Sequence, residues 1–124
     1  LRPDRLGHGV RSVEDPRVLD EVAEAGIALE VCPGSNLAMG VYPTPREVPL
    51  LALVGHGIPV ALGADDPLLF GSRLVAQYAL ARDALGCTDT QLADLARDSL
   101  RASRAPESVR SAALRDVDGW LARG

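Results

Sequence analysis

The sequence predicts an α/β fold built around a small parallel sheet. Three short apolar runs alternate with segments whose apolar residues recur at helical spacing. The last of these runs, residues 58–64, is almost continuously apolar, as expected of a strand that is covered on both faces. Strands that alternate with helices in this way are typical of βα units, whose strands pair in parallel. We expect one domain, or part of one.

Composition narrows the class of protein further. The chain has 124 residues, of which 47% are hydrophobic, and it carries a net charge of −4. This acidic balance argues against a nucleic-acid polymer as partner, because binding one needs a basic surface. No run of about 18 apolar residues is present, so we expect no membrane span. Cys32 and Cys87 form neither a disulfide framework nor a CxxC pair, which favours a cytoplasmic location.

The first elements follow from their boundary residues. Residues 5–9 read as the end of a first strand. Asp15 and Pro16 supply a helix N-cap and a proline at the first helical position. The helix that follows is expected to end at Gly26, a natural C-terminal stop.

The middle of the chain continues the alternation. Residues 27–32 are expected to form the second strand, ended by Pro33 and Gly34, with loop to about Pro45. A short helix is expected over residues 48–54. Residues 58–64 then form the third strand.

The remaining chain is expected to be helical. One helix is predicted over residues 72–85, and Thr88–Gln91 forms a capping box that opens the next, through about Ser103. Ala105–Pro106 begins the last helix. The apolar residues expected to be buried are Leu74, Val75, Tyr78 and Leu85 on the first of these helices, and Val109, Ala113, Leu114, Val117 and Trp120 on the last.

The tripeptide Gly-His-Gly occurs twice, at opposite ends of a βα unit. His8 follows a predicted strand, whereas His56 lies between a helix and the start of a strand. Chemistry in parallel α/β folds collects at the carboxyl ends of strands. We therefore expect His56 to be a surface residue near a helix C-terminus and His8 to be the functional candidate.

Two adjacent carboxylates follow the third strand. Asp65 and Asp66 lie at the same level as His8, so these groups could bind a divalent metal or perform acid–base chemistry. Two neighbouring carboxylates repel unless a cation or a donor stabilises them. Spacing alone leaves a structural alternative open: the aspartates could start a turn or helix before Pro67, and His8 could hydrogen-bond a neighbouring strand.

Three motifs in register resemble the adenosine deaminase family. They are RLGHGV (5–10), LEVCPGSN (29–36) and ALGADDPLLFGSRL (61–74). The resemblance covers essentially the whole chain and implies the C-terminal part of a (β/α)8 TIM barrel, about the last three βα units plus terminal helices. Residues 1–124 would then be a single partial domain of a zinc-dependent amidohydrolase.

The resemblance also implies roles for the polar residues. Asp65 would be a zinc ligand, Asp66 would contact the purine of the substrate, and His8 would orient or deprotonate the water bound to zinc. The implied activity is hydrolytic deamination of adenosine, to inosine and ammonia, or of a related 6-aminopurine. The implied cofactor is Zn²⁺, and the implied partner is a small purine nucleoside or base.

The remaining metal ligands of the family, an H-x-H pair and a further histidine with a glutamate, have no counterpart here. The chain opens with Leu1, and we expect it to be a piece of a longer protein. Two hypotheses stay open: the C-terminal segment of a deaminase, or a non-catalytic α/β module that retains remnant motifs. On its own the chain is expected to be inactive, to bind zinc poorly and, through open sheet edges, to self-associate or pair with the missing barrel segment.

Some positions depart from the family pattern. Val48 stands where relatives often carry histidine, and Gly63–Ala64 stands where many have Asn-Thr. Cys32 is interpreted as a buried, unreactive thiol. Ser35 and Asn36 are expected to shape the loop after the second strand, with a direct substrate contact as the alternative.

Overall fold

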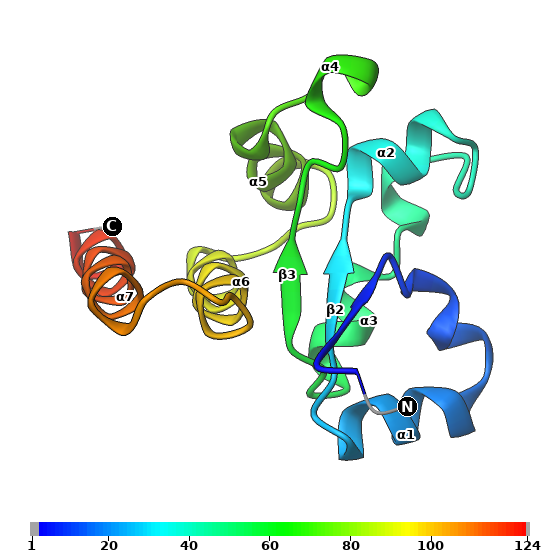
Figure 1. Cartoon of the computed structure of the whole chain (residues 1–124). Coiled ribbons are helices and arrows are strands. Elements are labelled where there is room, and N and C mark those ends of the chain that lie inside the picture. The colour runs from blue at the N-terminus through cyan, green and yellow to red at the C-terminus, as the bar shows by residue number, and fades with distance from the viewer. Residues whose placement is uncertain (1–2, 124) are drawn as a thin grey trace.

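A three-stranded parallel sheet lies at the centre of the computed structural model, which describes residues 3–123 (Figure 1). Its strands, in the spatial order β1-β2-β3, are β1 (Arg5–Gly7), β2 (Ala28–Val31) and β3 (Val60–Leu62). Leu29 of the central strand is in register with Leu6 on one side and Val60 on the other. The predicted α/β class and the order of the strands are therefore confirmed.

The helices agree with the sequence signals that start and stop them. In chain order they are η1 (Val10–Glu14), α1 (Pro16–Glu24), α2 (Pro33–Ala38), η2 (Pro45–Glu47), α3 (Leu50–Gly55), α4 (Pro67–Phe70), α5 (Leu74–Asp83), α6 (Asp89–Arg101) and α7 (Glu107–Arg123). Asp15 caps α1 by accepting a hydrogen bond from the Arg17 amide, and Thr88 forms the predicted capping box with Gln91. None of the helices in this described part of the chain is long and apolar enough to cross a bilayer.

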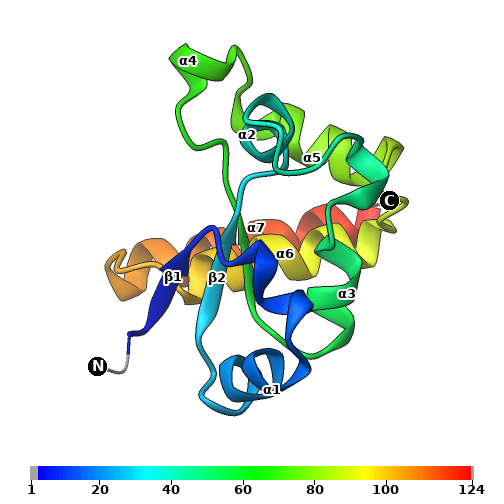
Figure 2. The same ribbon diagram turned by 90° about the vertical axis from the view of Figure 1, so that its right-hand side faces the viewer.

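The core lies between the sheet and its flanking helices. Leu29, Val31 and Val60 of the strands and Leu50 and Leu53 of α3 are completely buried. Figure 1 shows α6 beside β3 and α7 on the far side of α6, away from the sheet. The turned view in Figure 2 shows α2 and α4 beyond the carboxyl ends of the strands and α1 near the opposite end.

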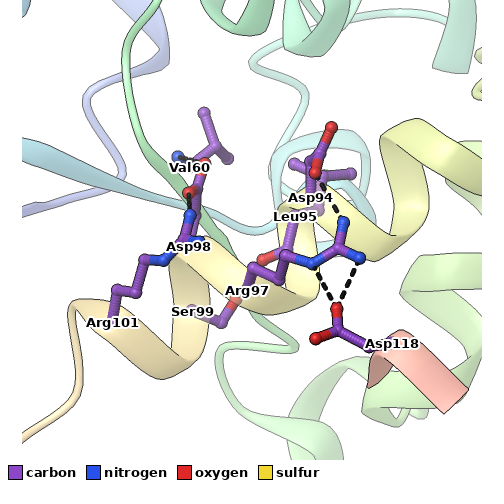
Figure 3. A network of polar contacts seen from close by, with 8 residues as sticks. All are labelled: Val60, Asp94, Leu95, Arg97, Asp98, Ser99, Arg101 and Asp118. Atoms are coloured by element: carbon purple, nitrogen blue, oxygen red, sulfur yellow. Dashed lines mark hydrogen bonds and ion pairs between the residues drawn. The ribbon is translucent and has the colours of Figure 1, made fainter. Parts of the chain in front are cut away.

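The outer edge of β3 is covered by side chains of α6. The amide of Val60 donates to Asp98 Oδ2 at 3.3 Å (Figure 3). The amide of Leu62 donates to Ser99 Oγ at 3.2 Å. The expectation of open edges is therefore wrong for β3, since a helix supplies the hydrogen bonds that a neighbouring strand would supply. It holds for β1, whose three residues are all exposed.

Arg97 ties the two C-terminal helices together. Its guanidinium donates to Asp94 Oδ1 on α6 at 2.7 Å and to Asp118 Oδ1 on α7 at 2.6 Å (Figure 3). These hydrogen bonds raise the pKa of Arg97. Arg97, a half-buried cation, therefore joins α6 to α7, whose apolar residues are only partly buried.

Two helices appear where loop or a stop was predicted. Residues 33–38 form α2 because Pro33 occupies the first helical position, where its fixed φ favours a helix and its missing amide costs nothing. Asp66 and Pro67 likewise begin α4, so Pro67 starts a short helix after the strand. The sequence predicts Pro33 only as the end of a strand, whereas a helix that starts at Asp66 and Pro67 is one of its two open alternatives.

The apolar stripes predicted for α5 and α7 are wrong in detail. Leu74 and Val75 are exposed, and the buried residues of α5 are Gln77 and Ala81. On α7 Val109 and Trp120 are exposed, and no residue of the helix is fully buried. Helical periodicity identified the helices, but which face packs depended on neighbours that periodicity does not specify.

Leu53→Ala should lower the free energy of unfolding by about 2–5 kcal/mol, because Leu53 is completely buried and truncation leaves a cavity. Leu68→Ala is the matched control: Leu68 is also helical but 96% exposed, and the change should stay within about 0.5 kcal/mol. Urea denaturation of both variants measures the difference. Equal losses would contradict this placement of the core.

Asp98 should make stability depend on pH. Burial raises its pKa above the ordinary value of 3.8, so the folded state holds the proton more tightly than the unfolded state. The stabilising contribution is therefore fully present below pH 3.8 and is lost as the pH rises through the raised pKa. Asp98→Asn keeps an acceptor for the Val60 amide without the charge, and should be the more stable protein at neutral pH. Unfolding curves whose midpoints shift in parallel with pH would exclude this effect.

Candidate active site

His8, Ser35 and Asp65 meet at the carboxyl edge of the sheet. His8 directly follows β1, Ser35 lies in α2 just after β2, and Asp65 lies in the loop after β3. His8 Nε2 is 3.7 Å from Asp65 Oδ2, and the Ser35 hydroxyl donates to the same Asp65 oxygen at 2.6 Å. The structure thus brings together His8 and Asp65, the pair expected from their positions after parallel strands.

The backbone is unusual at the same two residues. Among residues 3–123, His8 and Asp65 are the only non-glycine residues with positive φ, at 64° and 58°. The left-handed region is unfavourable for residues with a Cβ, and such conformations cluster at functional sites. The two strained residues are the ones whose side chains approach each other, at 3.7 Å.

Asp66 has a different role from its neighbour. Its Oδ1 accepts hydrogen bonds from the amides of Leu68 and Leu69, at 3.1 and 3.0 Å, and so caps the N-terminus of α4. The structural alternative considered for the Asp-Asp pair therefore describes Asp66, while Asp65 faces His8. Asp66 is exposed, and these amide bonds engage only one of its two carboxylate oxygens.

Cys32 is a buried residue close to Asp65. It is 7% exposed, as expected, and burial raises the pKa of its thiol, with a further increase from the negative charge of Asp65. A Cβ built on Gly63 would lie 3.2 Å from Cys32 Sγ. The small residue at position 63 thus leaves room for the buried sulfur.

Sequence reasoning missed the contributions of Ser35 and Gln77. Ser35 had been assigned to shaping a loop, but it lies in a helix and hydrogen-bonds Asp65. Gln77 is 1% exposed, and its side-chain oxygen accepts a hydrogen bond from the Gly34 amide at 2.8 Å. The sequence offered no signal for Gln77, because the apolar residues of this helix predicted that a different face of α5 is buried.

His56 lies apart from this group, as expected. It is the C-terminal cap residue of α3, is exposed, and contacts Asp20 of α1, with His56 Nε2 2.8 Å from Asp20 Oδ1. The two Gly-His-Gly copies therefore lie at opposite ends of the strands, His8 after β1 and His56 before β3.

The side chains at the carboxyl ends of the strands can supply one ligand of a metal site. Within residues 3–123 no cluster of three or more His, Cys, Asp or Glu side chains could hold a metal ion. Zinc sites use three or four protein ligands. The carboxylate of Asp65, 30% exposed and oriented by Ser35, suits one such ligand, and the others would have to come from outside this chain.

Comparison with known proteins agrees with the geometry. The model of the adenosine deaminase family matches residues 1–120. The "Putative adenosine/adenine deaminase" of Streptomyces coelicolor is 58% identical over 121 residues, which are 98% of this chain and 35% of that protein. The chain thus spans about a third of the length of this relative.

Solved structures share the same architecture. The crystal structure of adenine deaminase from Arthrobacter aurescens superimposes with a TM-score of 0.91 at 28% identity, covering 95% of this chain and 36% of that one. An amidohydrolase from Burkholderia ambifaria, solved with bound Zn, has the same fold at 21% identity and a TM-score of 0.77, covering 98% and 36%. The three βα units described above are part of a (β/α)8 barrel, and the chain belongs to the adenosine deaminase family.

Proposed function

We propose that this chain supplies one side of the active site of a zinc-dependent enzyme that hydrolytically deaminates adenosine, adenine or a related 6-aminopurine. The observation that carries the proposal is the meeting of His8 and Asp65, both in left-handed backbone conformation, at the carboxyl edge of the sheet. The similarity to adenosine and adenine deaminases supports this reaction class. In the reaction, water adds to the ring carbon that carries the amino group, and ammonia leaves.

Asp65 is proposed to be the zinc ligand of this segment. Its side chain is 30% exposed, and Ser35 holds one carboxylate oxygen by a hydrogen bond of 2.6 Å. Zinc, when bound, polarises water and lowers its pKa toward neutrality. The zinc in the amidohydrolase of the same fold supports the choice of metal.

His8 is proposed to be the acid–base residue. Its imidazole is 47% exposed and lies against the carboxylate of Asp65, so it can reach water that approaches Asp65. An imidazole can accept a proton from the attacking water and return one to the leaving amine.

Asp66 is proposed to bind the purine. The amides of α4 hold its Oδ1, so the carboxylate is fixed in orientation and its other oxygen is free to hydrogen-bond the base. A substrate held at a fixed angle reaches the reactive geometry at lower entropic cost.

The other zinc ligands are proposed to come from the rest of a complete barrel. For the 124-residue chain alone this leaves one carboxylate and one neighbouring imidazole, so weak zinc binding and no turnover are expected. The two free, buried cysteines suit a reducing compartment, which supports a cytoplasmic location.

Asp65→Ala in a complete barrel that contains this chain should remove one ligand and lower both the zinc content and the turnover number. Elemental analysis after dialysis measures the first, and a deamination assay with adenosine and adenine measures the second. Asp20→Ala, which removes an exposed carboxylate beside His56, is the control and should change neither. Full zinc occupancy together with normal turnover in Asp65→Ala would contradict the assignment of Asp65 as a zinc ligand.

The two histidines should behave differently. His8→Ala should lower kcat by about 10²–10⁴-fold, the usual contribution of an acid–base group, while zinc is retained. His56→Ala should leave kcat within a few-fold, because His56 contacts only the surface residue Asp20 among the side chains described. Steady-state kinetics measures kcat of both variants. Similar losses of kcat in the two would refute the assignment of the histidines to opposite ends of the strands.

A further inference from the structure

We infer that Gln77 is a positioning residue for the active site, because it anchors the N-terminal turn of α2, from which Ser35 orients Asp65. The inference rests on the proposed function, since it concerns how the proposed zinc ligand is held. Gln77 belongs to α5, which lies beside α2 beyond the carboxyl ends of the strands (Figure 2). It touches none of the proposed reacting groups directly.

Gln77 is a buried polar side chain whose amide is engaged at both ends. It is 1% exposed. Its Oε1 accepts a hydrogen bond from the Gly34 amide at 2.8 Å, and its Nε2 donates to Ser72 Oγ at 2.7 Å. A buried amide with both ends satisfied has a fixed orientation, whereas a partly satisfied one would destabilise the fold.

The contact with Gly34 replaces a missing helix cap. Cys32 is the N-cap residue of α2, and its side chain makes no capping hydrogen bond. The first amides of a helix have no partner within the helix, so they need an acceptor from elsewhere. Gln77, 43 residues further along the chain, supplies that acceptor to the second residue of α2. The position of this six-residue helix therefore depends on a tertiary contact.

The absence of a side chain at Gly34 leaves the space that the amide of Gln77 occupies. A Cβ built at position 34 would lie 2.8 Å from Gln77 Nε2 and 3.1 Å from Oε1. Any larger residue at position 34 would therefore displace the amide of Gln77 or shift the start of α2.

Ser35 links this anchor to the site. It follows Gly34 directly, is itself 1% exposed, and donates to Asp65 Oδ2 at 2.6 Å. The carboxylate of Asp65 can rotate about its side-chain bonds, and the hydrogen bond from Ser35 fixes the position of its Oδ2. A shift of the first turn of α2 would move Ser35 and release one oxygen of the proposed zinc ligand.

The test uses Gln77→Met in a complete barrel, a change that fills similar space and removes both polar ends. We expect zinc affinity and kcat to fall by about 10- to 100-fold, the range for residues that orient a metal ligand, with a smaller change in KM. Gln91→Ala is the matched control. It removes the other glutamine side chain, which accepts a hydrogen bond from the Thr88 amide at the start of α6, and should lower Tm without changing zinc affinity or kcat.

A double-mutant cycle with Ser35→Ala separates positioning from general destabilisation. If Gln77 acts through Ser35, then Gln77→Met should lower zinc affinity and kcat little further once Ser35 is alanine. Additive losses would overturn the inference, and so would a Gln77→Met protein that retains the zinc affinity and kcat of the wild type.

Ser72→Ala gives a second route if Gln77→Met does not fold. Ser72 is partly exposed and contacts the far end of the Gln77 amide, so its loss should shift zinc affinity in the same direction by a smaller factor. Unchanged zinc affinity in Ser72→Ala would then overturn the inference. A wild-type barrel that neither binds zinc nor deaminates a purine would instead overturn the proposed function, which distinguishes the two failures.

Discussion

The parallel register of the three strands is the constraint on which the site depends. Because β1 pairs in parallel with residues 28–30 of β2 and β3 with residues 29–31, Gly7 and Leu62 end within one residue of each other at the carboxyl end of the sheet. His8 and Asp65 emerge from strands that are not neighbours, and the gap between them is spanned by the segment after β2. A slip of one residue in either pairing would turn the side chains of that strand to the other face and separate the pair.

The site stores backbone strain, which the surrounding structure must offset. A left-handed residue with a side chain costs on the order of 1–3 kcal/mol, and two such residues face each other here. Residues that follow β2 support this pair. Ser35 donates a hydrogen bond to Asp65, and the buried side chain of Cys32 lies near Asp65. The buried amide of Gln77 extends this support to α5. The polar interior of the chain is therefore concentrated beneath one edge of the sheet.

The two edges of the sheet differ in how they are finished. Asp98 and Ser99 of α6 engage the free amides of β3, and Arg97 fastens α7 to the outside of α6 (Figure 3). β1 has no such cover among the described residues, and its exposed Leu6 lines a hollow together with the exposed Val18 of α1. In proteins of this family that are about three times as long, a strand edge of this kind belongs inside a barrel. Among the described residues the edge of β3 is therefore met by helix side chains, and that of β1 is not.

The sequence by itself determined the order of strands and helices, the caps at Asp15 and Thr88, and the separation of His8 from His56, because these depend on short-range signals and on which strand end a residue follows. It also determined the family, through three motifs in register. Only the tertiary structure decided that Asp65 faces His8 while Asp66 caps α4, that Pro33 starts a helix, and that α5 buries Gln77 in place of Leu74 and Val75. The contacts of Asp65 join it to Ser35 and His8, 30 and 57 positions away, and the burial of Gln77 depends on which face of α5 meets α2. The cap at Asp66 and the helix start at Pro33 are local, but the sequence left open whether each proline ends one element or begins the next. Local periodicity and propensity carry no information about such distant partners, and so they predicted the elements but not the contacts that make the site.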